Sequence, residues 1–265
     1  MEDPGKIIKR ISELAESGEE FAVATIVSAS EGTPRKTGTK MIIYPDSRFE
    51  YTIGGGALEE KVIEKSVDAL KKGESLKFSL EMTEDKSGMA CGGKADIFIE
   101  VFKKQEKVII FGGGHIGLSL SKILNMIEIP YVVIDNRKEY ASAERFPDAA
   151  EVKVLEYDQS ADKLKIDDNT YCVIITHGHK GDRAVLKGLL DTPAAYIGMI
   201  GSDKKINTVF KKIEEEGMII DNERIYSPIG LDTGGESPAE IAVSIAAEIL
   251  TVKYNKTGIS LKNKK

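Results

Sequence analysis

Cysteine, histidine and tryptophan are scarce in this chain of 265 residues, which has two cysteines, three histidines and no tryptophan. The cysteines, Cys91 and Cys172, stand far apart, so the sequence contains neither a disulfide framework nor a CxxC metal-binding pair. We therefore expect a reduced, cytoplasmic protein. Cys172 lies in the apolar run 171–176 and is expected to be an inert core residue.

Long apolar runs and an excess of positive charge are also missing. No run approaches the roughly 18 residues of a membrane-spanning helix, and the acidic first residues, followed by no apolar stretch, predict no signal peptide. The net charge of −6 argues against nucleic acid as a partner, because such partners require a basic surface. An apolar content of 41% and a charged content of 30% are typical of a soluble globular protein.

Glycine, in contrast, is concentrated at the start of a predicted helix in the middle of the chain. The apolar run 108–111 leads into Gly112, Gly114 and Gly117 in the spacing GxGxxG, and a helix-periodic segment follows. The next apolar run, 131–134, ends on Asp135. This order predicts a dinucleotide-type Rossmann unit, in which the glycines admit a phosphate to the helix amides and the acid accepts from ribose hydroxyls. A Rossmann-like domain without a nucleotide is the alternative interpretation.

The pattern of elements predicts an α/β protein with two domains. Residues 1–102 contain strands at 21–29, 76–80 and 95–102, a hairpin at 41–53 and a helix at 57–72, which indicates an α+β domain. Residues 107–254 alternate strands and helices, which indicates a Rossmann-like domain with a mostly parallel sheet. This half includes predicted helices at 140–145, 182–190, 204–216 and 238–253, and the polar stretch 255–265 is expected to be a flexible tail.

All three histidines fall in the second half. His115 lies inside the glycine loop, and His177 and His179 follow the buried strand 171–176. Because ligands of open α/β sheets bind beyond the carboxyl ends of the strands, these side chains are candidates to line a site, for proton transfer or for metal ligation. The alternative is one histidine that caps a helix and one that is solvated.

A second candidate for anion binding follows the strand 195–200. Gly201 and Ser202 offer a backbone amide and a hydroxyl, and Lys204 and Lys205 add positive charge. Alternatively, Asp203 is the N-cap of the next helix and the lysines are merely solvated.

The first domain repeats the order of strand, glycines and helix at Gly54, Gly55 and Gly56. This turn is a candidate cradle for a phosphate, or else a tight turn with close packing. Arg35, in the basic loop before it, is a candidate source of charge. Cys91 lies in a glycine-rich loop near Lys86 and Lys94, whose charge favours the reactive thiolate, and the alternative is a small residue in a turn.

Seven separated motifs of the chain together resemble the XdhC family, also called XdhC/CoxI or CoxF-type maturation factors of xanthine and carbon monoxide dehydrogenases. The resemblance covers about residues 23–250. Its motifs are GTPR with Gly38 at 32–38, TIGGGALE at 52–59, CGG at 91–93, FGGGHIG at 111–117, THGH at 176–179 with YIGMIGS at 196–202, and PIGLD at 228–232.

The resemblance implies a role rather than a reaction. Members of the family are thought to bind the molybdenum cofactor, to support its sulfuration by a cysteine desulfurase and to insert it into an apo molybdenum hydroxylase. On this basis Cys91 is expected to contact molybdenum or sulfur, the loops at 54–56 and 112–117 to hold phosphate groups, and His177 and His179 to line the site. The chain would then be a cofactor-insertion chaperone without turnover of its own.

Two other functions remain open from the residues alone. The same Rossmann loop would serve an NAD(P)-dependent oxidoreductase with a histidine as its acid or base. It would also serve a nucleotide-sensing interaction module. A homodimer is expected because that state is common among cytoplasmic proteins.

Overall fold

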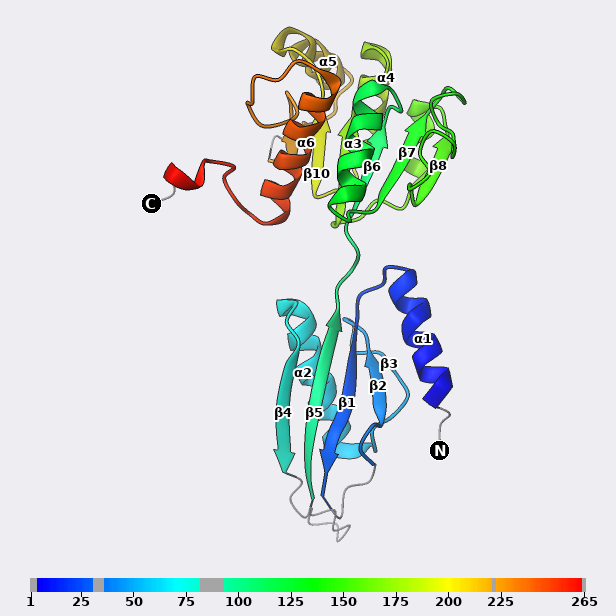
Figure 1. Ribbon diagram of the computed structural model, residues 1–265, viewed down its shortest axis with the longest axis vertical. Coiled ribbons are helices and arrows are strands. Elements are labelled where there is room, and N and C mark those ends of the chain that lie inside the picture. The colour runs from blue at the N-terminus through cyan, green and yellow to red at the C-terminus, as the bar shows by residue number, and fades with distance from the viewer. Residues whose placement is uncertain (1–3, 31–35, 82–92, 221–222, 264–265) are drawn as a thin grey trace. The chain divides into compact units, whose positions relative to one another are not determined.

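The computed structural model describes residues 4–30, 36–81, 93–220 and 223–263. The chain divides into two compact units, Met1–Gln105 and Glu106–Lys265 (Figure 1). Among the described residues, no helix is both long enough and apolar enough to cross a membrane.

An antiparallel sheet of five strands forms the centre of the N-terminal unit, in the order β3-β2-β1-β5-β4. Two helices pack against it, one on each face. In chain order the elements are α1 (Pro4–Glu16), β1 (Phe21–Ala29), β2 (Lys40–Ile43), β3 (Phe49–Glu50), α2 (Gly56–Lys72), β4 (Leu76–Glu81) and β5 (Lys94–Phe102).

Strand β1 shows how the sequence divides this unit into two cores. Its side chains alternate between the faces of the sheet. Ala22, Ala24 and Ile26 belong to the core under α2, whereas Phe21 and Val23 belong to the core under α1. Because helices cover both faces, the first four residues of β1 are all buried.

The C-terminal unit has a parallel sheet of six strands in the order β11-β10-β9-β6-β7-β8. Read from β8, this is the order 3-2-1-4-5-6 of a Rossmann fold. The elements are β6 (Lys107–Phe111), α3 (His115–Met126), β7 (Tyr131–Asp135), β8 (Glu151–Val154), the 3₁₀ turns η1 (Tyr157–Gln159) and η2 (Ala161–Lys163), β9 (Thr170–Ile174), α4 (His179–Leu189), β10 (Tyr196–Met199), α5 (Asp203–Glu215), β11 (Ile225–Tyr226), α6 (Pro238–Lys253) and η3 (Leu261–Asn263).

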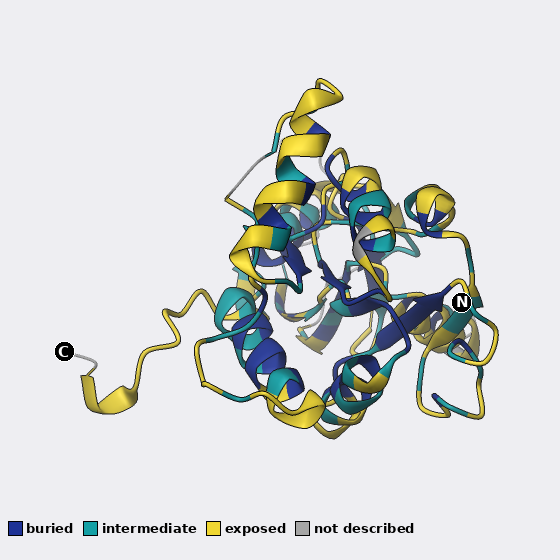
Figure 2. Ribbon diagram, turned by 90° about the horizontal axis from the view of Figure 1, so that it is seen from above, coloured by how far each residue is buried: buried dark blue, intermediate teal, exposed yellow. Residues whose placement is uncertain are grey.

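Helices cover both faces of this sheet. α3 and α6 pack on one face and α4 and α5 on the other, and each pair encloses a core of its own. Every residue of β7 and of β9 is therefore buried, as expected of parallel strands between two helical layers. In Figure 2 the central strands are dark blue, and the helices change from dark blue to yellow around their axes. The α/β fold with a mostly parallel second sheet is thus confirmed.

The structure differs from the sequence-based prediction at three elements. Residues 140–145 form hydrogen-bonded turns and no helix, with the Tyr140 amide donating to the Arg137 carbonyl at 3.0 Å and Arg145 to Ser142 at 3.1 Å. The second strand of the hairpin ends at Glu50, because Tyr51 adopts a φ of 66°, which lies outside the β region. Helix α4 begins at His179, three residues before the predicted start at 182.

Candidate functional site

The strand order brings two of the predicted site segments together at the carboxyl edge of the Rossmann sheet. β6 and β9 are neighbours although β7 and β8 lie between them in the sequence. The Ile175 amide, just beyond β9, donates to the Phe111 carbonyl at the end of β6 at 2.9 Å. The glycine loop and the segment from Thr176 to His179 therefore start side by side at the switch point, where open α/β sheets bind ligands.

The glycine loop is packed on one side and open on the other. A Cβ atom on Gly117 would lie 2.2 Å from the Gly112 carbonyl oxygen, so helix α3 approaches the loop closely only because residue 117 has no side chain. A Cβ atom on Gly114 would meet nothing within 4 Å. Gly114 is the N-cap of α3 and, because it has no side chain, it provides no side-chain hydrogen bond to the first amides of the helix. The first amides of α3 thus face an open approach that suits an anion.

Arg145 adds a positive charge to this loop, and sequence reasoning did not identify it. Its Nε donates to the Gly113 carbonyl at 2.9 Å and its Nη2 to the Gly114 carbonyl at 3.4 Å. No ion pair joins Arg145 to any acidic residue in the part of the chain that the structure describes. No local motif marks this arginine, since it lies 32 positions from Gly113 and reaches the loop through the turns at 137–146.

Asp135, predicted to accept from a ribose, uses both carboxylate oxygens within the protein. Oδ2 accepts from the Gly113 amide and from Arg137 Nη2, both at 2.9 Å, and Oδ1 accepts from Arg137 Nε at 2.9 Å and from the Arg137 amide at 3.0 Å. Burial acts to raise the pKa of Asp135, but the Arg137 and Gly113 hydrogen bonds outweigh it, so the pKa is lowered. The carboxylate is ionised and holds the glycine loop against the turn after β7.

The predicted histidines lie at this same edge. His115 is the first residue of α3 and His177 lies in the loop between β9 and α4, and both side chains are exposed. His179 is the first residue of α4, rather than a loop residue, and the structure does not describe its side chain. Among the described residues, no group of three or more His, Cys, Asp or Glu side chains is placed to hold a metal ion.

A buried polar network fixes the loop that carries His177. Asp182 Oδ1 accepts from the Thr176 hydroxyl at 2.7 Å and from the Thr176 amide at 3.1 Å. Lys205 Nζ, from α5, lies 2.5 Å from Asp182 Oδ2. The Asp182 side chain is fully buried and that of Lys205 is 16% exposed. Lys205 is therefore committed to this ion pair, instead of supplying free charge to an anion as its sequence position suggested.

Ser202 and Gly201 stand at the beginning of α5. Ser202, and not Asp203, is the N-cap residue, although its side chain makes no cap hydrogen bond. Its hydroxyl is exposed and faces a cavity between α4 and α5. Gly201 is half-buried beside the side chain of Lys205. Both residues lie at the carboxyl end of β10, as predicted.

Tyr157 is a further buried polar residue at this edge that the sequence did not single out. Its side chain is 8% exposed, and its ring packs against Gly181 in the first turn of α4. The hydroxyl has no well-aligned hydrogen-bond partner among the described residues. Burial, followed by the nearby charge of Asp135, raises its pKa. The neutral phenol thus fills the space between the turn after β7 and α4.

The last motif is held by a second buried acid that sequence reasoning missed. Glu248, on α6, accepts from the Tyr196 hydroxyl at 2.5 Å and from the Gly230 amide at 3.0 Å. Burial and then the charge of Glu248 raise the pKa of Tyr196 well above its usual value. The contact joins residues 52 positions apart, and it fixes the loop between β11 and α6.

The glycine turn of the N-terminal unit is open. Gly54, Gly55 and Gly56 have φ values of 133°, 80° and 62°, a region that side chains other than glycine rarely adopt. A Cβ atom on Gly55 or Gly56 would meet nothing within 4 Å. Thr52 Oγ1 accepts from the Gly54 amide at 3.1 Å and donates to Glu59 Oε2 at 2.5 Å, which orders the turn at the start of α2.

Two predicted site residues, Arg35 and Cys91, lie outside the described residues. The other cysteine, Cys172, is fully buried in β9, and burial raises the pKa of its thiol. Its assignment as an inert core residue is confirmed.

Comparison with known families identifies both halves of the chain. The model of the XdhC Rossmann domain matches residues 108–249, and that of the XdhC and CoxI family matches residues 14–80. The chain belongs to the XdhC and CoxI family. The resemblance seen in the sequence motifs is thus confirmed, and the Rossmann match covers the sheet whose edge is described above.

Two curated proteins are similar in sequence to this chain. The chain is 31% identical to the uncharacterized protein YqeB of Escherichia coli (strain K12) over 95% of its length and 47% of that protein. It is 26% identical to a probable xanthine dehydrogenase subunit of Bacillus subtilis (strain 168) over 60% of its length and 46% of that protein. It spans about half the length of these curated relatives.

A solved structure supports the fold. A Bacillus halodurans protein described as a xanthine dehydrogenase superposes with a TM-score of 0.54 at 19% identity, covering 94% of this chain and 96% of that one.

Proposed function

We propose that the chain is an accessory factor that matures a molybdenum hydroxylase of the xanthine dehydrogenase type. It binds the molybdenum cofactor as cargo, supports its sulfuration by a cysteine desulfurase and inserts it into the apo-enzyme. The observation that carries the proposal is the open, cationic glycine loop at the switch point in a member of the XdhC and CoxI family. The Bacillus subtilis relative, whose name points to a probable xanthine dehydrogenase component, supports the choice of client.

The described residues fit the phosphate end of such a cargo. The cargo is a phosphorylated pterin that carries molybdenum on a dithiolene, so its tail needs donors and positive charge. Gly114 leaves room for a phosphate at the first amides of α3, and the Arg145 guanidinium neutralises part of its charge from the adjoining carbonyls. The second glycine turn, at Gly54–Gly56, offers the start of α2 for the same chemistry in the other unit.

The same geometry disfavours an NAD(P)-dependent oxidoreductase. In dinucleotide-binding Rossmann folds the acid at the end of the second strand accepts from ribose hydroxyls. Here the Arg137 side chain donates to both oxygens of Asp135, so a ribose would have to displace an ion pair. A phosphate at Gly114 requires no such displacement.

Titration of the purified chain with molybdenum cofactor, and in parallel with NAD(H) and NADP(H), tests the proposal. We expect tight binding of the cofactor and no comparable binding of either nicotinamide. Gly114→Val places a branched side chain in the open approach and should weaken cofactor binding at least about tenfold. Met126→Ala, at the exposed far end of α3, is the matched control and should bind as the parent does. Nicotinamide binding alone would contradict the proposal in favour of the oxidoreductase.

Transfer is tested separately from binding. The loaded chain is incubated with apo xanthine dehydrogenase, and the recovery of xanthine oxidation is followed with and without a cysteine desulfurase and a sulfur source. The proposal expects recovery that depends on the chain, and expects Cys91→Ala to reduce it if the thiol contacts molybdenum or sulfur. Full recovery with Cys91→Ala removes that cysteine from the proposed role and leaves the phosphate site intact.

A further inference from the structure

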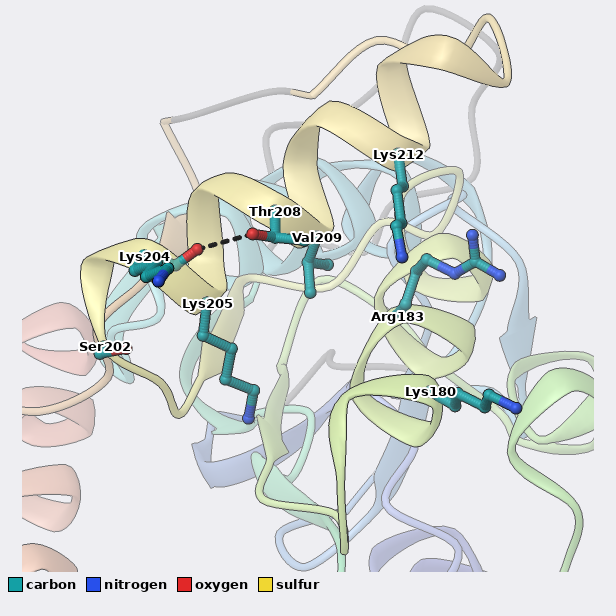
Figure 3. Close-up of a pocket in the computed structure, with 8 residues that line it drawn as sticks. All are labelled: Lys180, Arg183, Ser202, Lys204, Lys205, Thr208, Val209 and Lys212. Atoms are coloured by element: carbon teal, nitrogen blue, oxygen red, sulfur yellow. Dashed lines mark hydrogen bonds between the residues drawn. The ribbon is translucent and has the colours of Figure 1, made fainter.

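A basic cavity lies between α4 and α5 on the face of the Rossmann sheet opposite to α3 and α6. Its volume is about 560 Å³, within the range of small-molecule sites. Five cationic side chains line it, and no described carboxylate does: these are Lys180, Arg183, Lys204, Lys205 and Lys212. In Figure 3, Lys205 and Lys212 point from α5 toward α4, and Arg183 points from α4 toward α5.

Only two of the five cations are neutralised by acids of the described chain. Lys205 is paired with the buried Asp182, and Arg183 Nη1 lies 3.0 Å from Glu216 Oε1. Glu216 is itself shared with Lys187, which approaches its other oxygen. The remaining three, Lys180, Lys204 and Lys212, have no ion pair with any described residue.

Bringing like charges together across a narrow gap raises the free energy of the folded chain unless an anion enters. Arg183 and Lys212 approach each other from facing helices, and Glu216, the acid that pairs with Arg183, does not line the cavity. This geometry therefore indicates a ligand of opposite charge rather than a solvated helix face.

The helix starts add to the positive potential. Lys180 is in the first turn of α4 and Lys204 is in the first turn of α5, where unpaired amides carry partial positive charge. The Ser202 hydroxyl, which makes no cap bond, faces the same space. Asp203, the acidic residue in the first turn of α5, does not line the cavity. Val209, 3% exposed, provides an apolar floor.

We infer that this cavity binds a phosphorylated small molecule with at least two linked phosphates. Arg183 and Lys212, which face each other across the gap, suit the adjacent negative charges of a diphosphate, and the concave shape with its apolar floor suits a small molecule better than the flat contact of an acidic protein. The site is independent of the proposed function, because it lies on the other face of the sheet from α3 and involves no residue of the glycine loop.

Calorimetric titration of the full chain with inorganic diphosphate, ATP and adenosine tests the inference. Diphosphate and ATP should bind, more weakly as sodium chloride is raised, and adenosine should not. Similar affinities for diphosphate and ATP would assign the site to the phosphate chain alone, whereas tighter ATP binding would show that it also holds the nucleoside. Binding of neither would overturn the inference.

Charge variants locate the binding. Lys212→Ala should weaken diphosphate binding about tenfold, since it removes an unneutralised cation that points across the gap, and Lys180→Ala should weaken it less, since Lys180 points away from α5. Lys211→Ala is the matched control, because Lys211 is 77% exposed, pairs with Glu215 and does not line the cavity, and it should change the affinity less than about twofold. All these lysines are on helix surfaces, so thermal melting should show folded variants. An equal loss with Lys211→Ala would overturn the site.

Two further titrations separate this site from its alternatives. Gly114→Val should leave in place the diphosphate binding that Lys212→Ala weakens, and a complete loss of diphosphate binding with Gly114→Val would assign the phosphate to the glycine loop and refute the cavity. A polyglutamate peptide should compete poorly with diphosphate. If the peptide bound and diphosphate did not, the surface would be a protein-docking site and the inference would be wrong.

Discussion

The two glycine turns of this chain share a sequence pattern and differ in what the glycines do. At Gly54–Gly56 all three residues adopt positive φ, and the space around Gly55 and Gly56 is open. At Gly117 the φ angle is ordinary for a helix, and a backbone carbonyl occupies the place of a side chain. The first turn needs glycine for its backbone conformation, whereas Gly117 is needed for close packing. The same motif thus predicts a helix start in both units and a different cost of substitution in each.

The largest effect is expected from Gly117→Ala. The new methyl group would meet the Gly112 carbonyl oxygen at 2.2 Å, and because this atom belongs to the backbone, α3 must move away from the sheet. We expect a loss of about 3 kcal/mol in the free energy of unfolding of the C-terminal unit. Urea denaturation followed by circular dichroism measures it. Gly114→Ala, which meets no atom within 4 Å, is the control and should stay within about 0.5 kcal/mol of the parent.

A smaller effect is expected from Asp135→Asn. The amide cannot keep the ion pair with Arg137, and the unfolding free energy at pH 7 should fall by about 2 kcal/mol. Because the folded pKa of Asp135 is lowered, its contribution is complete above the unfolded pKa of about 3.9 and is lost as the pH falls through the folded value. The difference between parent and variant should therefore shrink below about pH 4.

Denaturation curves at several pH values, with the exposed Asp148→Asn as control, check this dependence. A difference that stays constant from pH 7 to pH 2 would show that Asp135 acts through shape alone and not through its charge.

The smallest effect is expected from Gly56→Ala in the N-terminal unit. No atom blocks the methyl group, so the cost is the strain of a φ of 62°, about 1 kcal/mol. The comparison predicts that this loss is smaller than that of Gly117→Ala and that it appears in the N-terminal unit. Hydrogen exchange resolved by segment assigns each loss to its unit. A larger loss for Gly56→Ala than for Gly117→Ala would reverse the distinction between the two turns.

The sequence predicted what depends on local pattern. Buried apolar runs identified the parallel strands, and the glycine spacing identified the start of α3, because both signals lie within a few neighbouring residues. The start of α6 at 238 was predicted for the same reason, and in the structure Ser237 and Glu240 form a capping box there.

What the sequence did not predict depends on contacts between distant segments. The residues at 140–145 favour a helix by local pattern, whereas the structure draws these turns against the glycine loop through Arg145. From its position after the strand 195–200, Lys205 was expected to be a free cation, but Asp182, on another helix, forms an ion pair with it. The basic cavity is of the same kind, since its lysines belong to α4 and α5 and only the order of the strands makes those helices neighbours.

The side chain of Arg137 decides whether Asp135 can accept hydrogen bonds from a ligand. Its guanidinium donates to both oxygens of Asp135, while the neighbouring backbone amides donate to the same carboxylate without its help. Shortening this one side chain would leave an acceptor position free on each oxygen, at the place where dinucleotide enzymes recognise a sugar. A single substitution at Arg137 would therefore convert Asp135 from an acid that holds its own loop into one that can accept hydrogen bonds from a sugar.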